Sequence, residues 1–260
     1  MCQTTRAIFG SNAVIRRVFP PCPRAITGKT VRFIIFDPKK QIDSRSDLKA
    51  AINQVGSFYN NLKNTSGLSN AIKADLASYN FVVEYRPSAP DDSTLLNLGR
   101  MDFPVYLFNT PGISATSTSI SEIQQLMQRH QISAMSFLRA FNTIHPELPI
   151  LAPVVDNYKT IESSWENRDV LGFGFPGGYY NNGSCGKLGI IKIDALLTIT
   201  STFDTDSERL TWVLQHELGH MFALVHHDDS LMNDKYDRHF AAFLPLQIGH
   251  VRDTLKRVSP

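Results

Sequence analysis

The feature that most constrains this chain of 260 residues is a histidine-rich stretch in its last third. The run His216-Glu217-Leu218-Gly219-His220 places two histidines four residues apart, and His226 follows six residues after the second. Because residues four apart share one face of an α-helix, His216 and His220 can bind one metal ion. The fold must therefore present a helix that carries this pair and ends before His226, so that the chain can fold back under the metal.

The spacing of these residues is typical of a catalytic zinc site. Zinc binds neutral imidazole nitrogens, and a catalytic site combines three protein ligands with a fourth position that is open to water. Glu217 lies close enough to that water to act as its general base. It is also the last glutamate of the chain, so no later glutamate can supply a third ligand. His226 is then the expected third ligand, and His227, Asp228 and Asp229 are competing donors nearby.

On these residues the chain resembles the metzincin zinc peptidases, which share H-E-x-x-H-x-x-G-x-x-H followed by a methionine-containing turn. Met232, in Ser230-Leu231-Met232, is the counterpart of the methionine in that Met-turn. Within the group the chain is most similar to the matrixin (matrix metalloproteinase-like) branch. Residues 169–178 and 189–194 repeat the strand, glycine loop, strand pattern that precedes the active-site helix, and residues 244–251 resemble the closing helix.

The resemblance implies an α/β (α+β) fold. In such a zincin domain a twisted mixed sheet packs on the active-site helix, and a small helical subdomain follows at the C-terminus. The catalytic domain is expected to span residues 29–260, with a cleft between an upper part, 29–222, and a lower part, 223–260. Residues 1–28 would form a basic N-terminal segment, as a pro-segment or a targeting tail. Residues 110–165 have no counterpart and are expected to be an insertion.

The resemblance also implies a zinc endopeptidase that holds one zinc ion with His216, His220 and His226. Glu217 would act as general base toward the water that attacks the peptide bond. Met232 would lie beneath the zinc as an apolar floor. The expected partner is a protein or peptide substrate.

Three further groups of residues have a possible role by the same resemblance. Leu171, Gly172, Phe173 and Gly174 would form an edge strand to which an extended peptide can add, although every open sheet has such edges. Tyr236 could assist the oxyanion, or be an ordinary surface or core tyrosine. Cys22, within Pro20-Pro21-Cys22-Pro23-Arg24, could fill the open zinc position as a latency ligand, or be a packed thiol.

The chain departs from the family pattern at particular positions. Ala223 stands where the family has glycine, and if that position needs positive φ, alanine costs about 1 kcal/mol. The interval from His226 to Met232 is shorter than in typical matrixins. No histidine-rich loop precedes residue 216 to hold a second zinc, so His130 and His145 are expected to be surface or helix-end residues.

Two alternative functions remain open. A metzincin-like domain could be catalytically weak or inactive and serve as a zinc-binding interaction module, which Ala223 and the short turn would favour. Retention of Glu217 argues against this, because a structural zinc site has no use for a general base and closes its fourth position. A zinc hydrolase that acts on a non-peptide amide would share the chemistry and differ only in its pocket.

Periodicity predicts the remaining elements. Residues 31–36, 81–86 and 103–108 are rich in β-branched and aromatic residues and predict strands, and residues 46–62 predict a helix. A helix from Ser119 or Ser121 to about residue 141 and a strand at 150–155 are expected next. The active-site helix should begin at 204–207, and its buried face is expected to consist of Leu210, Val213, Leu214, Leu218 and Met221.

Composition limits the other functions. A net charge of +2 without a basic run between aromatics makes nucleic acid an unlikely partner, and no apolar stretch is long enough to span a membrane. The three cysteines do not form a disulfide framework. The first 36 residues hold six basic residues and no acid, but no secretory signal peptide is recognisable. Secretion or export is favoured by the family resemblance alone.

Overall fold

The computed structural model describes residues 29–91, 94, 98–108, 125, 130, 171–175, 187–199, 204–237 and 239–259. Within these residues one sheet contains the strands β1 (Thr30–Phe36), β2 (Asn80–Arg86), β3 (Asp102–Phe108), β4 (Gly172–Phe175) and β5 (Leu188–Lys192). The helices are α2 (Ser46–Asn61), α3 (Asn70–Ala77), α8 (Ile193–Thr198), α9 (Asp206–Met221) and α10 (Pro245–Val258), and a short 3-10 helix, η1, covers Leu62–Asn64.

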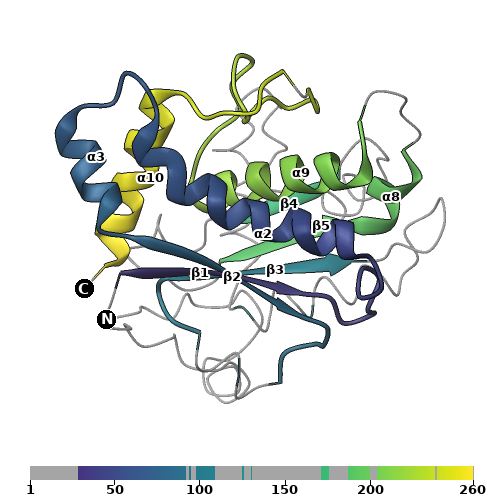
Figure 1. Ribbon diagram of the computed structural model, residues 1–260. Coiled ribbons are helices and arrows are strands. Elements are labelled where there is room, and N and C mark those ends of the chain that lie inside the picture. The colour runs from purple at the N-terminus through teal and green to yellow at the C-terminus, as the bar shows by residue number, and fades with distance from the viewer. Residues whose placement is uncertain are drawn as a thin grey trace, which may run out of the picture.

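The sheet is mixed and mostly parallel. Its strand order is β2-β1-β3-β5-β4, and β4 alone runs antiparallel to its neighbour. Helices α2 and α9 lie side by side over one face of this sheet, whereas α3 and α10 pack together beyond one end of the strands (Figure 1). Arg252 and Lys256 of α10 both pair with Asp75 of α3, at 3.0 and 2.7 Å. The observed fold class is therefore the mixed α/β arrangement that the sequence predicts.

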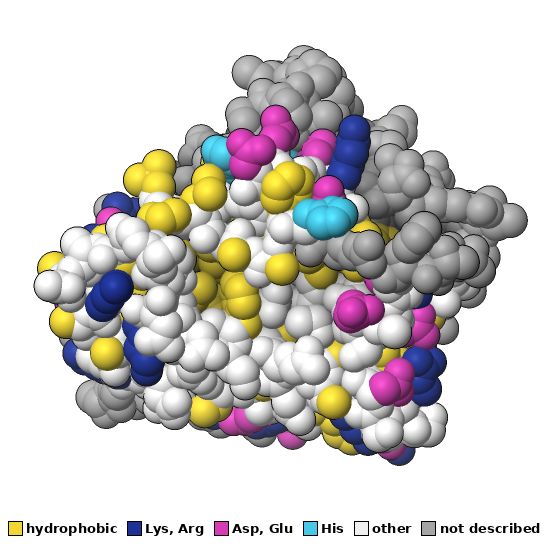
Figure 2. Space-filling view, turned by 45° about the horizontal axis from the view of Figure 1, so that its top comes forward, with side chains coloured by type: hydrophobic (Ala, Val, Ile, Leu, Met, Phe, Trp, Pro, Cys, Tyr) yellow, Lys and Arg dark blue, Asp and Glu magenta, His cyan; other side chains and the backbone are white. Residues whose placement is uncertain are grey.

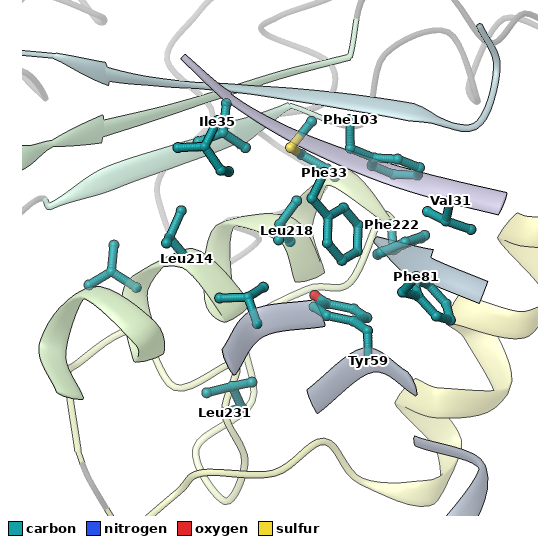
Figure 3. Close-up of a cluster of buried hydrophobic side chains, with 14 of the residues drawn as sticks. Val31, Phe33, Ile35, Tyr59, Phe81, Phe103, Leu214, Leu218, Phe222 and Leu231 are labelled. Carbon is teal, nitrogen blue, oxygen red and sulfur yellow. The ribbon is translucent and has the colours of Figure 1, made fainter. Parts of the chain in front are cut away.

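The core lies between the sheet and the two helices that cover it. Phe33 of β1 and Phe103 of β3 point toward Tyr59 of α2 and Phe222 at the end of α9 (Figure 3). The ring centroids of Phe33 and Tyr59 are 4.8 Å apart, and those of Phe103 and Phe222 are 4.5 Å apart. The Tyr59 hydroxyl donates to the Gln215 carbonyl of α9 at 3.0 Å, so its polar atom is also satisfied. Since each buried ring contributes about 1.5–3 kcal/mol, this cluster fixes α9 against the sheet.

The opposite face of the sheet carries a second aromatic contact. Phe36 of β1 stacks on Tyr106 of β3 at 5.1 Å between ring centroids. The Tyr106 hydroxyl and Nε2 of His130 lie 2.7 Å apart, and His130 is only 7% exposed. His130 was expected to be a surface or helix-end residue, and the surface part of that expectation is wrong, because the ring is buried against a strand and pairs with a tyrosine hydroxyl.

The strands at 31–36, 81–86 and 103–108 and the helix at 46–62 are confirmed to within a residue at each end. The pattern at 189–194 is a strand only as far as Lys192, because Ile193 begins α8 with Asp194 in its first turn. Helix α3 was not predicted from the sequence, although Ser69 caps it by accepting from the Ile72 N–H at 3.3 Å. The helix expected to end near residue 141 and the strand at 150–155 lie outside the described residues.

None of the described helices is both long and apolar enough to cross a membrane.

Candidate metal centre

Helix α9 carries the histidine pair, and its start is fixed by a capping box. The Thr205 hydroxyl accepts from the Glu208 N–H at 3.2 Å, and the Glu208 carboxylate accepts from the Thr205 N–H at 2.8 Å. Two of the unpaired N–H groups of the first turn are thereby satisfied, and the helix begins at Asp206 as the sequence predicts. His216 and His220 then lie in its last two turns, 6% and 3% exposed.

Three imidazole rings converge at the end of this helix. Nε2 of His220 lies 3.0 Å from Nε2 of His216 and 3.1 Å from Nε2 of His226. Among the described residues, these three form the only group of three or more His, Cys, Asp or Glu side chains that could hold a metal ion. The turn that the sequence requires between His220 and His226 therefore brings the third histidine back to the pair.

The backbone determines which nitrogens face the centre. Nδ1 of His216 lies 2.9 Å from the Leu231 carbonyl, and Nδ1 of His220 lies 2.8 Å from the Leu224 carbonyl. Since a carbonyl only accepts hydrogen bonds, both Nδ1 atoms carry a proton, and each ring in its neutral form then has its lone pair at Nε2. Lone pairs 3.0 Å apart repel each other unless a proton or a cation lies between them. Such carbonyl contacts are the usual outer support of metal-binding histidines.

The donor set fits a zinc ion. Zinc–nitrogen bonds are about 2.0–2.1 Å long, which in a tetrahedral site separates the nitrogens by about 3.4 Å. Two of the three separations, 3.0 and 3.1 Å, lie within a few tenths of an ångström of this value, and all three nitrogens lie within 4.8 Å of one another. Three neutral imidazoles also leave one position of a tetrahedral site for a water or a substrate.

Helix α9 ends in a turn with Ala223 at a left-handed φ of 64°. The Leu224 N–H donates to the Gly219 carbonyl at 3.0 Å, and the Ala223 N–H donates to the His220 carbonyl at 2.8 Å. This pair of bonds defines a Schellman motif, whose left-handed position is usually occupied by glycine. The position does require positive φ, so the turn has the ordinary shape and the alanine is strained within it.

Glu217 is buried beside the ligands with part of its hydrogen-bonding capacity unused. Its side chain receives a hydrogen bond from the Gly174 N–H of β4, while Oε2 has no partner. Burial raises the pKa of Glu217 well above its ordinary value, and the Gly174 N–H opposes that shift. An unpartnered oxygen on a buried carboxyl beside the ligands is a natural acceptor for a water or a substrate group.

Strand β4 lies at the edge of the sheet and presses directly on α9. A Cβ added to Gly174 would overlap the Glu217 carbonyl oxygen and would lie 2.7 Å from Cβ of His220, so only glycine allows this approach. The predicted substrate strand, Leu171 to Gly174, is therefore an edge strand next to the histidines, with Leu171 just before β4. Its Gly174 N–H is already used by Glu217.

Met232 lies under the ligand-bearing helix. A Cβ on Gly219 would overlap Sδ of Met232, so the methionine packs against the helix backbone between the two histidines of α9. The segment is held by the Met232 carbonyl, which accepts from the His227 N–H at 2.9 Å, and by the Ser230 hydroxyl, which accepts from the Met232 N–H at 3.1 Å. Met232 therefore packs against α9 between His216 and His220, and its role as the floor of a zinc site stays a prediction.

The ring of Trp212 lies between Tyr236 and His216. The Tyr236 hydroxyl hydrogen-bonds the Asp204 carboxylate, and the Tyr236 ring meets Trp212 edge-on at 5.2 Å. Trp212 in turn stacks on His216 at 4.9 Å. The oxyanion role of Tyr236 stays a prediction, and the hydroxyl would have to leave Asp204 to take part. Trp212 was not among the predicted site residues, although its spacing of four residues from His216 could have indicated the contact.

His227 is exposed, and its Nδ1 accepts from the Asp229 N–H at 3.3 Å. Its ring therefore makes a contact within its own loop and is not part of the group formed by His216, His220 and His226. Asp228 and Asp229 are also exposed. Figure 2 shows acidic and histidine side chains gathered at the upper end of one face of the molecule. Of the competing third ligands, His226 is the one that the structure brings to the pair. Cys22 and residues 1–28 lie outside the described residues.

Comparison with known families and with curated proteins finds no match for this chain. The likeness to the metzincins therefore rests on the residues quoted above.

Proposed function

We propose that this protein is a zinc-dependent endopeptidase with a metzincin-like fold. The observation that carries the proposal is the convergence of three Nε2 atoms beside a buried carboxyl that has a free oxygen. A purely structural zinc site closes all four positions with protein ligands and needs no such acid. The mixed sheet, its edge strand next to α9 and the methionine beneath the helix agree with the same assignment.

Zinc, when bound, supplies an acidified water and polarises the carbonyl group of the scissile bond. His216, His220 and His226 would hold the ion through Nε2, and the Leu231 and Leu224 carbonyls keep the Nε2 atoms of His216 and His220 free of their ring protons. Glu217 takes a proton from the attacking water at Oε2 and passes it to the leaving amine. Burial raises the pKa of Glu217 above its ordinary value, and the Gly174 N–H opposes that shift.

The edge position of β4 suits an extended peptide substrate. A peptide that adds to this edge would gain backbone hydrogen bonds, and its scissile bond would pass over the histidines. The Gly174 N–H would then donate its hydrogen bond to the substrate instead of to the Glu217 carboxylate. We infer that substrate binding frees the Glu217 carboxylate for its role as a base.

The test measures bound zinc and cleavage of a mixed peptide library for the full chain. Glu217→Gln is the matched variant, because it keeps the size of the side chain and removes the base. Cys22→Ala is measured in parallel, so that a thiol in residues 1–28 cannot suppress cleavage unnoticed. His226→Ala and His227→Ala form a second matched pair, which separates the proposed third ligand from its neighbour.

The expected result is about one zinc per chain, cleavage by the native protein or by Cys22→Ala, and none by Glu217→Gln. His226→Ala should lose zinc and activity, whereas His227→Ala should keep both. Zinc binding with no cleavage by native protein or Cys22→Ala would refute the peptidase and favour the interaction module. Cleavage of small acyl amides but no peptides would move the assignment to a non-peptide amide hydrolase.

A further inference from the structure

Trp212 lies one helical turn before His216 on α9 and covers the face of that imidazole. The two ring planes are inclined by only 22°, with their centroids 4.9 Å apart. The indole is 8% exposed, so the contact is shielded from water on most sides. Residues four apart on a helix meet in this way, but a parallel stack requires that both rings are held flat.

The indole is held from outside the metal centre. Its Nε1–H donates to the Phe240 carbonyl at 3.2 Å, and the Tyr236 ring meets it at 87°. The Tyr236 hydroxyl bonds Asp204, whose carboxylate lies 3.4 Å from the Arg209 guanidinium. Since none of these contacts involves a proposed metal ligand, the indole is fixed whether or not an ion is bound.

This contact adds to the support that His216 receives at Nδ1. The Leu231 carbonyl holds the edge of the ring at Nδ1 and so fixes the tautomer, whereas the indole supports the face of the ring. A flat indole against the imidazole face opposes rotation of the ring about its Cβ–Cγ bond and so favours the orientation in which Nε2 is directed at His220 and His226. An imidazole that donates its lone pair to a cation also becomes more positive, which favours its contact with the electron-rich indole face.

We propose that Trp212 is a positioning residue for the first metal ligand. It holds the His216 ring in its metal-binding orientation before the ion arrives, and thereby raises the affinity of the site for zinc. The inference rests on the metal centre of the proposed function, but it does not depend on peptide hydrolysis.

The test compares Trp212→Leu and Trp212→Phe with the native chain. Zinc affinity is measured by competition with a chromophoric chelator, and the free energy of unfolding of the metal-free protein is measured by urea denaturation. Loss of a residue that supports a ligand lowers metal affinity about 10–100-fold, and we expect this for Trp212→Leu. Phenylalanine retains a stacking face, so Trp212→Phe should recover most of the affinity.

Phe81→Leu is the matched control, because it also replaces a buried aromatic ring but on β2, in contact with Phe33 and Tyr59. It should lower the free energy of unfolding and leave zinc affinity unchanged. Fluorescence gives a second readout: in a Trp165→Phe chain, Trp212 is the remaining tryptophan, and a bound Co²⁺ ion should quench it.

Equal zinc affinity of native, Trp212→Leu and Trp212→Phe proteins would overturn the proposal. An equal loss in both variants would overturn it as well, because the stacking face would then not be the cause. If Trp212→Leu fails to fold, Trp212→Phe and the Co²⁺ quenching decide, and unquenched Trp212 fluorescence at saturating Co²⁺ refutes the proposed contact. A protein that shows the expected Trp212 dependence but cleaves no peptide would refute the proposed function alone.

Discussion

Replacing Ala223 by glycine should stabilise the protein. Ala223 has a φ of 64°, where an L-residue with a Cβ is disfavoured by about 1–2 kcal/mol relative to the right-handed region. Glycine removes that strain but gives the unfolded chain more freedom, which opposes the gain by about 0.4–1 kcal/mol. The net expectation is an increase of about 0.5–1 kcal/mol in the free energy of unfolding.

The measurement is urea denaturation of the metal-free protein, supported by thermal unfolding. For a chain of this size the gain corresponds to a rise of about 1–4 °C in Tm. Zinc affinity should change little, because the turn already has the shape that brings His226 to the other ligands. The denaturant slope m should also stay unchanged, since the same surface becomes exposed on unfolding.

Two other positions give matched controls away from the metal centre. Lys40, at φ 54°, is the other described non-glycine residue with positive φ, so Lys40→Gly should stabilise by a similar amount. Gly67 has φ 80°, and a Cβ there would make an ordinary contact of 3.4 Å with Pro245, so Gly67→Ala tests the same strain in the opposite direction. If both controls behave as expected and Ala223→Gly is neutral or destabilising, the left-handed turn at Ala223 is refuted.

Three further changes test other parts of the structure. Thr205→Ala removes the acceptor for the Glu208 N–H and should cost about 1 kcal/mol by urea denaturation, whereas an unchanged midpoint would refute the capping box. Gly174→Ala forces a methyl group into α9, so it should cost about 1–3 kcal/mol and weaken zinc binding, while Gly249→Ala, with its nearest contact at 3.8 Å, should not destabilise. Burial lowers the pKa of Lys187 to about 7, against the raising effect of Asp102, so the unfolded chain binds its proton more tightly. Native stability should then rise between pH 7 and about 10.5, and this rise should be absent in Lys187→Met when unfolding is measured at pH 6 and 9.

The elements that could be predicted from the sequence are those whose own residues specify their structure. The β-branched run of β1 and the threonine and glutamate at the start of α9 specify their own structure through backbone preference and capping. The end of β5 was misplaced because Ile193 favours a strand by propensity, while the following residues form a helical turn. Helix α3 was missed because its eight residues give too short a pattern for helical periodicity.

The convergence of the three histidines could be predicted from the sequence, but the contacts that orient their rings could not. His216, His220 and His226 have a spacing that only a common ligand explains well. The Leu231 and Leu224 carbonyls that orient two of these rings are backbone atoms, which every residue has, so no sequence pattern indicates them. Gly174 acts through the absence of a side chain, and its contact with α9 depends on where the sheet ends.

The turn after α9 contacts His220 on one side and helix α10 on the other. Ala223 places Leu224 so that its N–H closes the helix and its carbonyl contacts Nδ1 of His220, and His226 follows two residues later. From the other side, the Thr254 hydroxyl of α10 donates to the Phe222 carbonyl at 3.1 Å in a buried contact. A strained residue persists where its surroundings over-determine its conformation, and here both sides of the turn are fixed. Alanine at position 223 therefore costs stability, while the position of His226 is set by contacts that do not require glycine.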